Sequence, residues 1–270
     1  MKTNVYTLIT GASEGFGKAL AVECASRKMN LILVALPGTQ LKCFANMLKE
    51  NYAIDAVAIE KDLSVEENCL AVYTEVVERN FNVNILINNV GLGSTMLFKE
   101  GSLDFYQKQV KLNVMTATVM TYLFLDMLRS NSPSYILNVG SLCCFFYLMK
   151  KQVYGATKSY IYFFSKSLRR ELSPEYINVS VICPGPMNTN KSVTSLNETN
   201  NWLTRMSTMN PEEVAPIAIE GLLNKKEVII PGFLNQFFLF LDLMIPSFLK
   251  RMITDAQMRN LASVSAVQRN

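Results

Sequence analysis

The sequence predicts an α/β fold in which helices cover both faces of a parallel sheet of about seven strands. Short apolar or β-branched runs alternate with longer segments of helical periodicity along the chain. The runs are nearly continuously apolar, as expected for strands that are buried on both faces. Half of the 270 residues are hydrophobic and 18% are charged, so a large core can form and a disordered chain is excluded.

The predicted elements follow one another in a regular order. The strand candidates are 5–10, 31–35, 56–59, 85–87, 135–139, 179–182 and 228–230. The helical segments are 15–28, 39–51, 65–80, 103–130, 152–172 and 211–223. The last of these begins at Asn210, an N-cap residue followed by a first-turn proline and two acidic residues. No linker or repeat interrupts the order, so residues 1–270 are expected to form one domain.

Composition excludes several kinds of function. The net charge is +4 and the basic residues are scattered, so we expect no nucleic-acid partner. The chain has no histidine, which excludes histidine-dependent triads and histidine-containing metal sites. The six cysteines form no Cys-x-x-Cys pair, which indicates reduced thiols in a cytoplasmic protein without a bound metal. The first apolar run is too short for a signal peptide.

A glycine-rich turn, Thr10-Gly11-Ala12-Ser13-Glu14-Gly15-Phe16-Gly17, joins the first predicted strand to the first helix. Glycines let the backbone turn tightly and approach a pyrophosphate, whose charge is received by free amides at the helix N-terminus. Such a turn alone is weak evidence, because plain strand-to-helix connections also contain glycine. The residues that would hold a dinucleotide here are Gly11, Ser13, Glu14, Gly15, Phe16 and Gly17.

Further motifs follow in order along the chain. They are Asp62-Leu63 after the third strand, Asn88-Asn89-Val90-Gly91 after the fourth, Asn113 within a helix, Ser141 at the end of the fifth strand, Tyr154-Gly155-Ala156-Thr157-Lys158 in the next helix, and Pro184-Gly185-Pro186-Met187-Asn188-Thr189 after the sixth strand. With the Gly-x-x-x-Gly-x-Gly turn, this series resembles the short-chain dehydrogenase/reductase family, from which Val90 is a mild departure.

The resemblance implies a fold, an activity and a set of site residues. The fold would be a single Rossmann-like, doubly wound domain, and the activity an NAD(P)(H)-dependent interconversion of a ketone and a secondary alcohol. The catalytic residues would be Asn113, Ser141, Tyr154 and Lys158, with Asn113 supporting a water chain to the lysine. Besides the glycine turn, the cofactor would contact Asp62, Leu63, Asn89, Val90, Gly91, Tyr154, Lys158, Pro184, Gly185 and Thr189.

The Tyr-x-x-x-Lys spacing has a chemical reason of its own. Tyr154 and Lys158 are four residues apart in a predicted helix, so they share one face. An ammonium near a phenol stabilises the phenolate and lowers the pKa of the tyrosine toward the operating pH. The Ser141 hydroxyl can hold a substrate carbonyl oxygen beside the phenol. The arrangement therefore predicts proton transfer by Tyr154.

The choice of cofactor depends on the end of the second strand. NAD-binding enzymes commonly have an acidic residue there, whereas a basic residue accepts the extra phosphate of NADP. Residues 34–38 contain neither. Glu14 would oppose a 2′-phosphate, and Lys18 or Lys42 could reach one. The missing acid favours NADP(H) over NAD(H).

The expected substrate and partners are inferred from two loops, one apolar and one polar. Residues 142–149 either line a pocket for an apolar keto-lipid, ketoacyl or steroid substrate, or pack at a subunit interface or under a lid. Residues 188–210 are rich in Ser, Thr and Asn and predict a substrate lid. We expect a homodimer or a homotetramer.

Residues 233–270 are predicted to form an apolar helical extension. The stretch 233–249 is too short and too polar to span a bilayer. It can cover the substrate cleft, pack on another subunit, or make a peripheral membrane contact through 233–251. The tail also resembles the family branch that contains long-chain ketoacyl reductases and hydroxysteroid dehydrogenases.

Two other functions are open to a chain of this kind. One is a catalytically idle dinucleotide-binding scaffold or sensor, which would need the fold but not the intact set of four catalytic residues. The other is a sugar-modifying relative, which the apolar loops disfavour.

Overall fold

The computed structural model describes residues 5–146, 148–189, 194 and 206–244. The chain divides into two compact units, Met1–Gly232 and Phe233–Asn270. All of the strands belong to the first unit, and the described part of the second unit is the helix α10 (Phe233–Met244).

The first unit contains the predicted parallel sheet, and every strand pair in it is parallel. The strands are β1 (Val5–Thr10), β2 (Asn30–Ala35), β3 (Ala56–Glu60), β4 (Asn82–Asn88), β5 (Ser134–Val139), β6 (Ile177–Ile182) and β7 (Val228–Ile229). Their order in the seven-stranded sheet is β3-β2-β1-β4-β5-β6-β7. The order reverses between β1 and β4, and a crevice for ligands opens at that point in doubly wound sheets.

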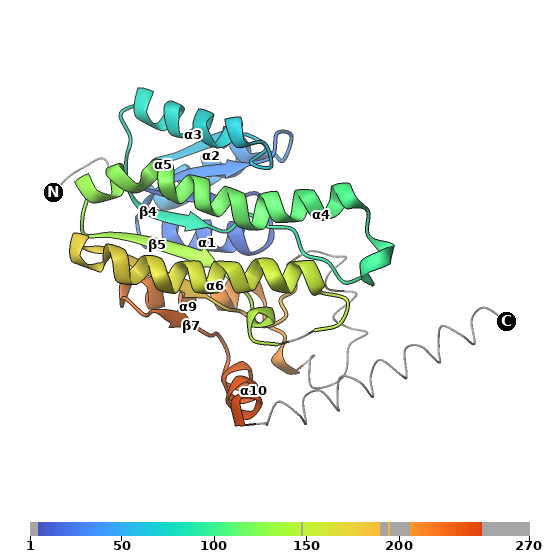
Figure 1. The fold of residues 1–270 in the computed structure, drawn as a ribbon. Coiled ribbons are helices and arrows are strands. Elements are labelled where there is room, and N and C mark those ends of the chain that lie inside the picture. Colours follow the sequence, from blue (N-terminus) through green and yellow to red (C-terminus); the bar gives the residue numbers. More distant parts are fainter. Residues whose placement is uncertain (1–4, 147, 190–193, 195–205, 245–270) are drawn as a thin grey trace. The chain divides into compact units, whose positions relative to one another are not determined.

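Helices cover both faces of this sheet (Figure 1). They are α1 (Gly15–Ser26), α2 (Leu41–Tyr52), α3 (Glu66–Glu78), α4 (Leu103–Val110), α5 (Thr116–Ser130), α6 (Gln152–Leu172) and α9 (Pro211–Leu223). One core joins α1, α2 and α9 to the sheet, and a second core joins α3, α5 and α6 to it. This arrangement confirms the predicted fold class.

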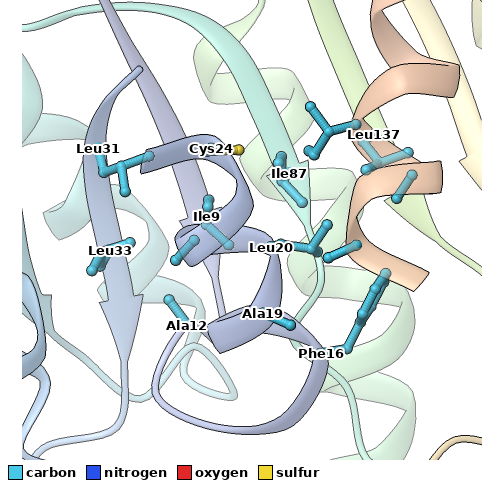
Figure 2. Close-up of a cluster of buried hydrophobic side chains, with 14 of the residues drawn as sticks. Ile9, Ala12, Phe16, Ala19, Leu20, Cys24, Leu31, Leu33, Ile87 and Leu137 are labelled. Carbon is cyan, nitrogen blue, oxygen red and sulfur yellow. The ribbon is translucent and has the colours of Figure 1, made fainter. Parts of the chain in front are cut away.

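The core beneath α1 explains how the glycine-rich turn is held in place. Leu20 of α1 lies near Ile9 of β1 and Ile87 of β4, and Phe16 belongs to the same buried cluster (Figure 2). Ile9, Leu20 and Ile87 are fully buried, and burial of such a side chain contributes about 1.5–3 kcal/mol. The helix that follows the turn is therefore anchored to the two strands that flank the crevice.

The segment 103–130 differs from the single helix that its periodicity predicts. The short π-helical turn η2 (Lys111–Met115) separates α4 from α5. Asn113 lies within this turn, where the helix accommodates an extra residue. Turns of this kind occur frequently at functional sites because they redirect a side chain.

The two ends of the predicted lid, residues 188–210, are hydrogen-bonded to each other. Met187 pairs with Met209 in an isolated parallel bridge, and the Asn188 amide donates to the Met209 carbonyl over 3.2 Å. Residues 190–193 and 195–205 of the predicted lid lie outside the described residues. Asn210 then begins α9 with a reciprocal cap, in which its backbone amide donates to the Glu213 carboxylate over 2.8 Å. This confirms the predicted start of that helix.

The second unit begins as the apolar helix that the sequence predicts. Within α10 the rings of Phe233 and Phe237, one turn apart, stack with their centroids 6.4 Å apart. Residues 245–270 lie outside the described residues. No helix in the described part of the chain is both long enough and apolar enough to cross a bilayer.

Candidate active site

The motif residues meet at one edge of the sheet. The glycine-rich turn follows β1, Asn89 to Gly91 follow β4, Ser141 follows β5, and Pro184 to Thr189 follow β6. Because all strands are parallel, these segments share the carboxyl edge of the sheet. The predicted site residues of these segments thus lie along the edge of the sheet at which the strand order reverses between β1 and β4.

The glycine-rich turn has the geometry that a pyrophosphate requires. Gly11 and Gly15 have φ angles of +66° and +51°, which residues other than glycine rarely adopt. Helix α1 begins at Gly15, and its N-cap residue Glu14 makes no side-chain capping bond. The first amides of α1 thus have no side-chain cap, and such amides with the positive end of the helix suit an anionic group. The turn fits a dinucleotide.

Asn89 and Val90 hold the turn to β4. The Asn89 side-chain amide donates to the carbonyls of Thr10 over 2.9 Å and Gly11 over 3.1 Å. The backbone amides of Asn89 and Val90 donate to the Thr10 hydroxyl over 3.0 and 3.1 Å. The motifs predict these two residues as cofactor contacts and do not single out Thr10. The signal for Thr10 was a buried hydroxyl at the last position of β1.

Asp62 stabilises the turn after β3. Its carboxylate accepts from the Ser64 amide over 2.9 Å, and the Leu63 carbonyl accepts from the Thr116 hydroxyl over 2.8 Å. Burial pushes the pKa of Asp62 upward, but the hydrogen bonds from Ser64 and the charge of Lys108 together outweigh it and leave the pKa below its usual range. Asp62 is therefore ionised at neutral pH.

Thr189 lies beside the glycine-rich turn. A Cβ built on Gly15 would be 3.0 Å from the Thr189 Cβ. The Pro184 carbonyl accepts from the Leu142 amide over 2.9 Å. The segment after β6 is thereby connected both to the turn after β1 and to the segment after Ser141.

Ser141, Tyr154 and Lys158 come together as the spacing predicts. Ser141 caps the short 3-10 helix η3 (Leu142–Cys144), where its hydroxyl accepts from the Cys143 amide over 3.2 Å. The Tyr154 phenol lies near the Ser141 hydroxyl, which lowers the pKa of the phenol. The Lys158 ammonium is 5.8 Å from the centroid of the Tyr154 ring and donates to the Val139 carbonyl over 2.7 Å. A phenol, a hydroxyl and an ammonium therefore share one small site.

The two titratable groups are perturbed mainly by burial. Burial raises the pKa of Tyr154, and the neighbouring thiols raise it further, while the Ser141 hydrogen bond lowers it. The lowering that we expected from Lys158 is therefore not found for the protein alone. Burial also lowers the pKa of Lys158 to about 8. At neutral pH the phenol is protonated, which is the form that donates a proton.

Asn113 connects the segment after β4 to α6. Its side-chain oxygen accepts from the Leu92 amide over 2.7 Å, and its nitrogen donates to the Leu92 carbonyl over 3.1 Å and the Thr157 hydroxyl over 3.0 Å. The Thr157 hydroxyl in turn donates to the Tyr154 carbonyl over 2.7 Å. Asn113 thus positions neighbouring segments. Gln109, which the sequence motifs do not indicate, also donates to the Leu92 carbonyl over 2.9 Å.

The apolar loop 142–149 packs partly on α6. Leu142 is buried, and the Phe145 ring meets the Tyr162 ring edge-on with centroids 4.9 Å apart. Leu148 is exposed, and Tyr147 lies outside the described residues. An open recess of about 440 Å³ lies between α4, η2 and α6, lined by Val110, Val114, Gln152, Val153, Ala156 and Thr157. None of the predicted catalytic side chains lines this recess.

The lysines that could favour NADP have other contacts. The Lys18 ammonium lies 5.2 Å from the centroid of the Phe44 ring, and the Lys42 ammonium is 3.8 Å from the Glu60 carboxylate. Lys42 is largely exposed, so this ion pair is weak and the side chain can be redirected. Among the described residues, no cluster of three or more His, Cys, Asp or Glu side chains could hold a metal ion.

Comparison with known proteins agrees with this geometry. The chain is 26% identical over 217 residues to the 3-oxoacyl-[acyl-carrier-protein] reductase of Aquifex aeolicus, covering 79% of this chain and 88% of that protein. Among solved structures, the bulky-bulky ketone specific alcohol dehydrogenase of Comamonas testosteroni superposes with a TM-score of 0.76 at 28% identity, covering 90% of this chain and 92% of that one.

A short-chain dehydrogenase from Sphingobium yanoikuyae, solved in complex with NADPH, also has a TM-score of 0.76, at 25% identity and with coverage of 96% of this chain and 95% of that one. The family model described as short chain dehydrogenase matches residues 6–200. Because this match spans well over half of the sequence, the chain belongs to the short-chain dehydrogenase/reductase family of NAD(P)-dependent oxidoreductases.

Proposed function

We propose that this protein reduces an apolar ketone to a secondary alcohol, or catalyses the reverse reaction, with Tyr154 as the group that transfers the proton. The observation that carries the proposal is the meeting of Ser141, Tyr154 and Lys158 at the edge of the sheet that also holds the glycine-rich turn. A nicotinamide bound along that edge would supply or accept the hydride.

Each of these side chains has a distinct part in the reaction. The Ser141 hydroxyl, which lies near the Tyr154 phenol, orients the substrate oxygen toward the phenol. The raised pKa of Tyr154 keeps its proton in place until negative charge develops on that oxygen. The Lys158 ammonium, buried 5.8 Å from the phenol ring, stabilises the phenolate that is left behind. Asn113 positions the backbone of Tyr154, because it donates to the Thr157 hydroxyl, which donates to the Tyr154 carbonyl.

The proposed substrate is a keto-lipid, a ketoacyl thioester or a steroid. The loop after Ser141 is apolar, and Leu148 within it is exposed, which suits an apolar substrate next to the phenol. The relative from Aquifex aeolicus is a 3-oxoacyl reductase, and the structure from Comamonas testosteroni is specific for bulky ketones. Both names favour a carbonyl with large apolar substituents.

The proposed cofactor is NADP(H). No acidic side chain stands at the end of β2, where residues 34–38 read Val-Ala-Leu-Pro-Gly. Lys42 is exposed and weakly paired, and it is close enough in sequence to β2 to serve a 2′-phosphate. The neighbour from Sphingobium yanoikuyae was solved with NADPH.

We also propose that copies of this chain associate through the outer face of α5 and α6. Tyr122 and Phe163 are 79% and 65% exposed there, and the rings of Tyr160 and Phe164 stack with centroids 5.6 Å apart. An exposed aromatic face can meet its own copy across a two-fold axis. Light scattering should give a dimer or tetramer mass for the protein and a lower mass for Phe163→Glu.

The test of the reaction is a turnover screen with the full chain. NADPH and NADH are each offered with long-chain 3-ketoacyl thioesters, ketosteroids, small ketones and keto sugars, while nicotinamide absorbance is followed. We expect turnover with the first two classes and a preference for NADPH. Dinucleotide binding without turnover of any class would favour the scaffold or sensor instead. Tyr154→Phe, which keeps the ring and loses only the hydroxyl, is the matched control.

A further inference from the structure

Three thiols surround the predicted catalytic pair, and the proposed reaction uses none of them. Cys143 and Cys144 belong to η3, directly after Ser141, and Cys183 directly follows β6. Negative charge on these three sulfurs would raise the pKa values of both Tyr154 and Lys158. All six cysteines of the chain are free. The sulfurs of Cys144 and Cys183, however, are only 3.9 Å apart.

The backbone holds these two sulfurs side by side. Beyond the ends of β5 and β6 the ladder continues, because the Gly140 amide donates to the Ile182 carbonyl over 2.7 Å and the Leu142 amide to the Pro184 carbonyl over 2.9 Å. Cys144 and Cys183 therefore lie on adjoining, connected segments. A disulfide has a sulfur–sulfur length of about 2.05 Å, so closure needs a movement of about 2 Å from the present separation.

The two thiols differ in access. Cys183 is fully buried in a small apolar cluster with Ala117, Ile161 and Val181, whereas Cys144 is half-buried at the edge of that cluster. The hydrogen bond with Cys144, followed by burial, raises the pKa of Cys183, although the Lys158 ammonium opposes this. Cys183 is thus protected from direct oxidation and positioned as the second thiol of a pair.

We propose that Cys144 and Cys183 are a redox-modification site that hydroperoxides convert to a disulfide. The Cys144 sulfur attacks the peroxide and becomes a sulfenic acid, while hydrogen peroxide loses one oxygen and leaves as water. The Cys183 sulfur then displaces the hydroxyl from this sulfur, and a second water leaves. Overall, two thiols lose two hydrogens and one peroxide is reduced to two waters. A dithiol reductant reverses the change by thiol–disulfide exchange.

Formation of this disulfide is expected to displace Ser141, because a single helical turn separates Cys144 from it. Cys144 ends η3, and its amide donates to the Ser141 carbonyl over 3.1 Å. A shift of Cys144 toward β6 therefore moves the Ser141 hydroxyl relative to the nearby Tyr154 phenol. This consequence for turnover rests on the proposed function, whereas formation of the disulfide does not. Displacement of a reacting group by about 1 Å can lower the rate by about 10²-fold, and we expect a loss of that order.

The experiment treats the full chain with hydrogen peroxide and maps its peptides by mass spectrometry without reduction. We expect a cross-linked pair of peptides containing residues 144 and 183, lighter by two hydrogens, that disappears on treatment with dithiothreitol. Because Cys143 is adjacent to Cys144, the mapping is repeated in Cys143→Ser, which must still form the cross-link. Cys144→Ser must not form it. Failure to detect the cross-link in wild type and Cys143→Ser, under conditions that oxidise the exposed Cys43, overturns the proposal.

Turnover and NADPH binding are then measured on the same samples. We expect peroxide to lower turnover about 10²-fold in wild type and in Cys143→Ser, with recovery after dithiothreitol, and to leave Cys144→Ser active. An equal loss in Cys144→Ser would show that oxidation elsewhere is responsible and would refute the regulatory role. If the protein turns over no ketone at all, the proposed function fails, but the cross-link still decides whether the modification site exists.

Discussion

Gly17→Ala tests whether the glycine-rich turn is as closely packed as the structure indicates. In most helices this substitution stabilises by up to about 1 kcal/mol, because alanine has the higher helix propensity. In α1, however, an added Cβ would overlap the Gly11 carbonyl oxygen and the Asn89 side-chain amide, and would stand 2.8 Å from the Gly11 carbonyl carbon. These are backbone atoms and a doubly hydrogen-bonded amide, so they cannot move aside easily.

Overpacking of this kind costs about 1–3 kcal/mol, which exceeds the helix-propensity gain. For a chain of this size, a loss of about 2 kcal/mol lowers Tm by roughly 4–8 °C. Gly155→Ala is the matched control, because Gly155 is also helical but its nearest neighbour, the Cys143 carbonyl oxygen, is 3.5 Å from the added Cβ. We expect Gly155→Ala to raise Tm slightly.

The assay is thermal unfolding followed by circular dichroism, together with NADPH titration of each variant. Gly17→Ala should unfold earlier and bind NADPH more weakly, since a shift of the Gly11 peptide would displace the first turn of α1, whose amides are proposed to receive the pyrophosphate. A Tm for Gly17→Ala equal to or above that of wild type would refute the close packing of the turn.

Three other predictions address the catalytic pair and the second unit. Tyr154→Phe should lower turnover at least about 10²-fold while NADPH titrations stay close to wild type, because the phenol transfers a proton and does not hold the phosphates; near-normal turnover would contradict the mechanism. Because burial lowers the pKa of Lys158 from 10.5 to about 8, the folded protein binds fewer protons than the unfolded chain between these values. Its stability in urea should therefore rise with pH across that interval by up to about 3 kcal/mol more than that of Lys158→Met, and parallel pH profiles would argue against the lowered pKa. Removal of residues 233–270 should impair turnover of long-chain ketones more than of small ones if the segment covers the cleft, whereas loss of sedimentation with liposomes at unchanged turnover would indicate a membrane contact.

The fold was predictable from the sequence because its strands are almost uninterrupted apolar runs. Residues 31–35, for example, read Leu-Ile-Leu-Val-Ala, and all five are buried between the two helical layers. Such a run requires cover on both faces, which only a parallel sheet between helices provides. The glycine spacing was equally informative, since the backbone at Gly11 and Gly15 adopts positive φ angles.

Contacts between distant segments were not predictable in the same way. The π-helical turn at Asn113 interrupts a stretch whose periodicity is continuous, because its cause is tertiary: the Asn113 side chain bonds Leu92, 21 residues earlier, and Thr157, 44 residues later. The approach of Cys144 to Cys183 depends on the pairing of β5 with β6. Neither relation leaves a local pattern in the sequence.

The structure also divides the motif residues by what their side chains already contact. Asn89 is engaged with the carbonyls of the glycine-rich turn, and Asn113 with Leu92 and Thr157. The side-chain donors of both residues, and the acceptor of Asn113 as well, are engaged by the segments that they hold, which leaves these groups little capacity for a ligand. The groups that remain for a ligand include the first amides of α1, which the Glu14 side chain does not cap, the Ser141 hydroxyl, and the half-buried phenol of Tyr154. Resemblance to a family locates a site, and the hydrogen bonds decide which of its residues bind and which only position others.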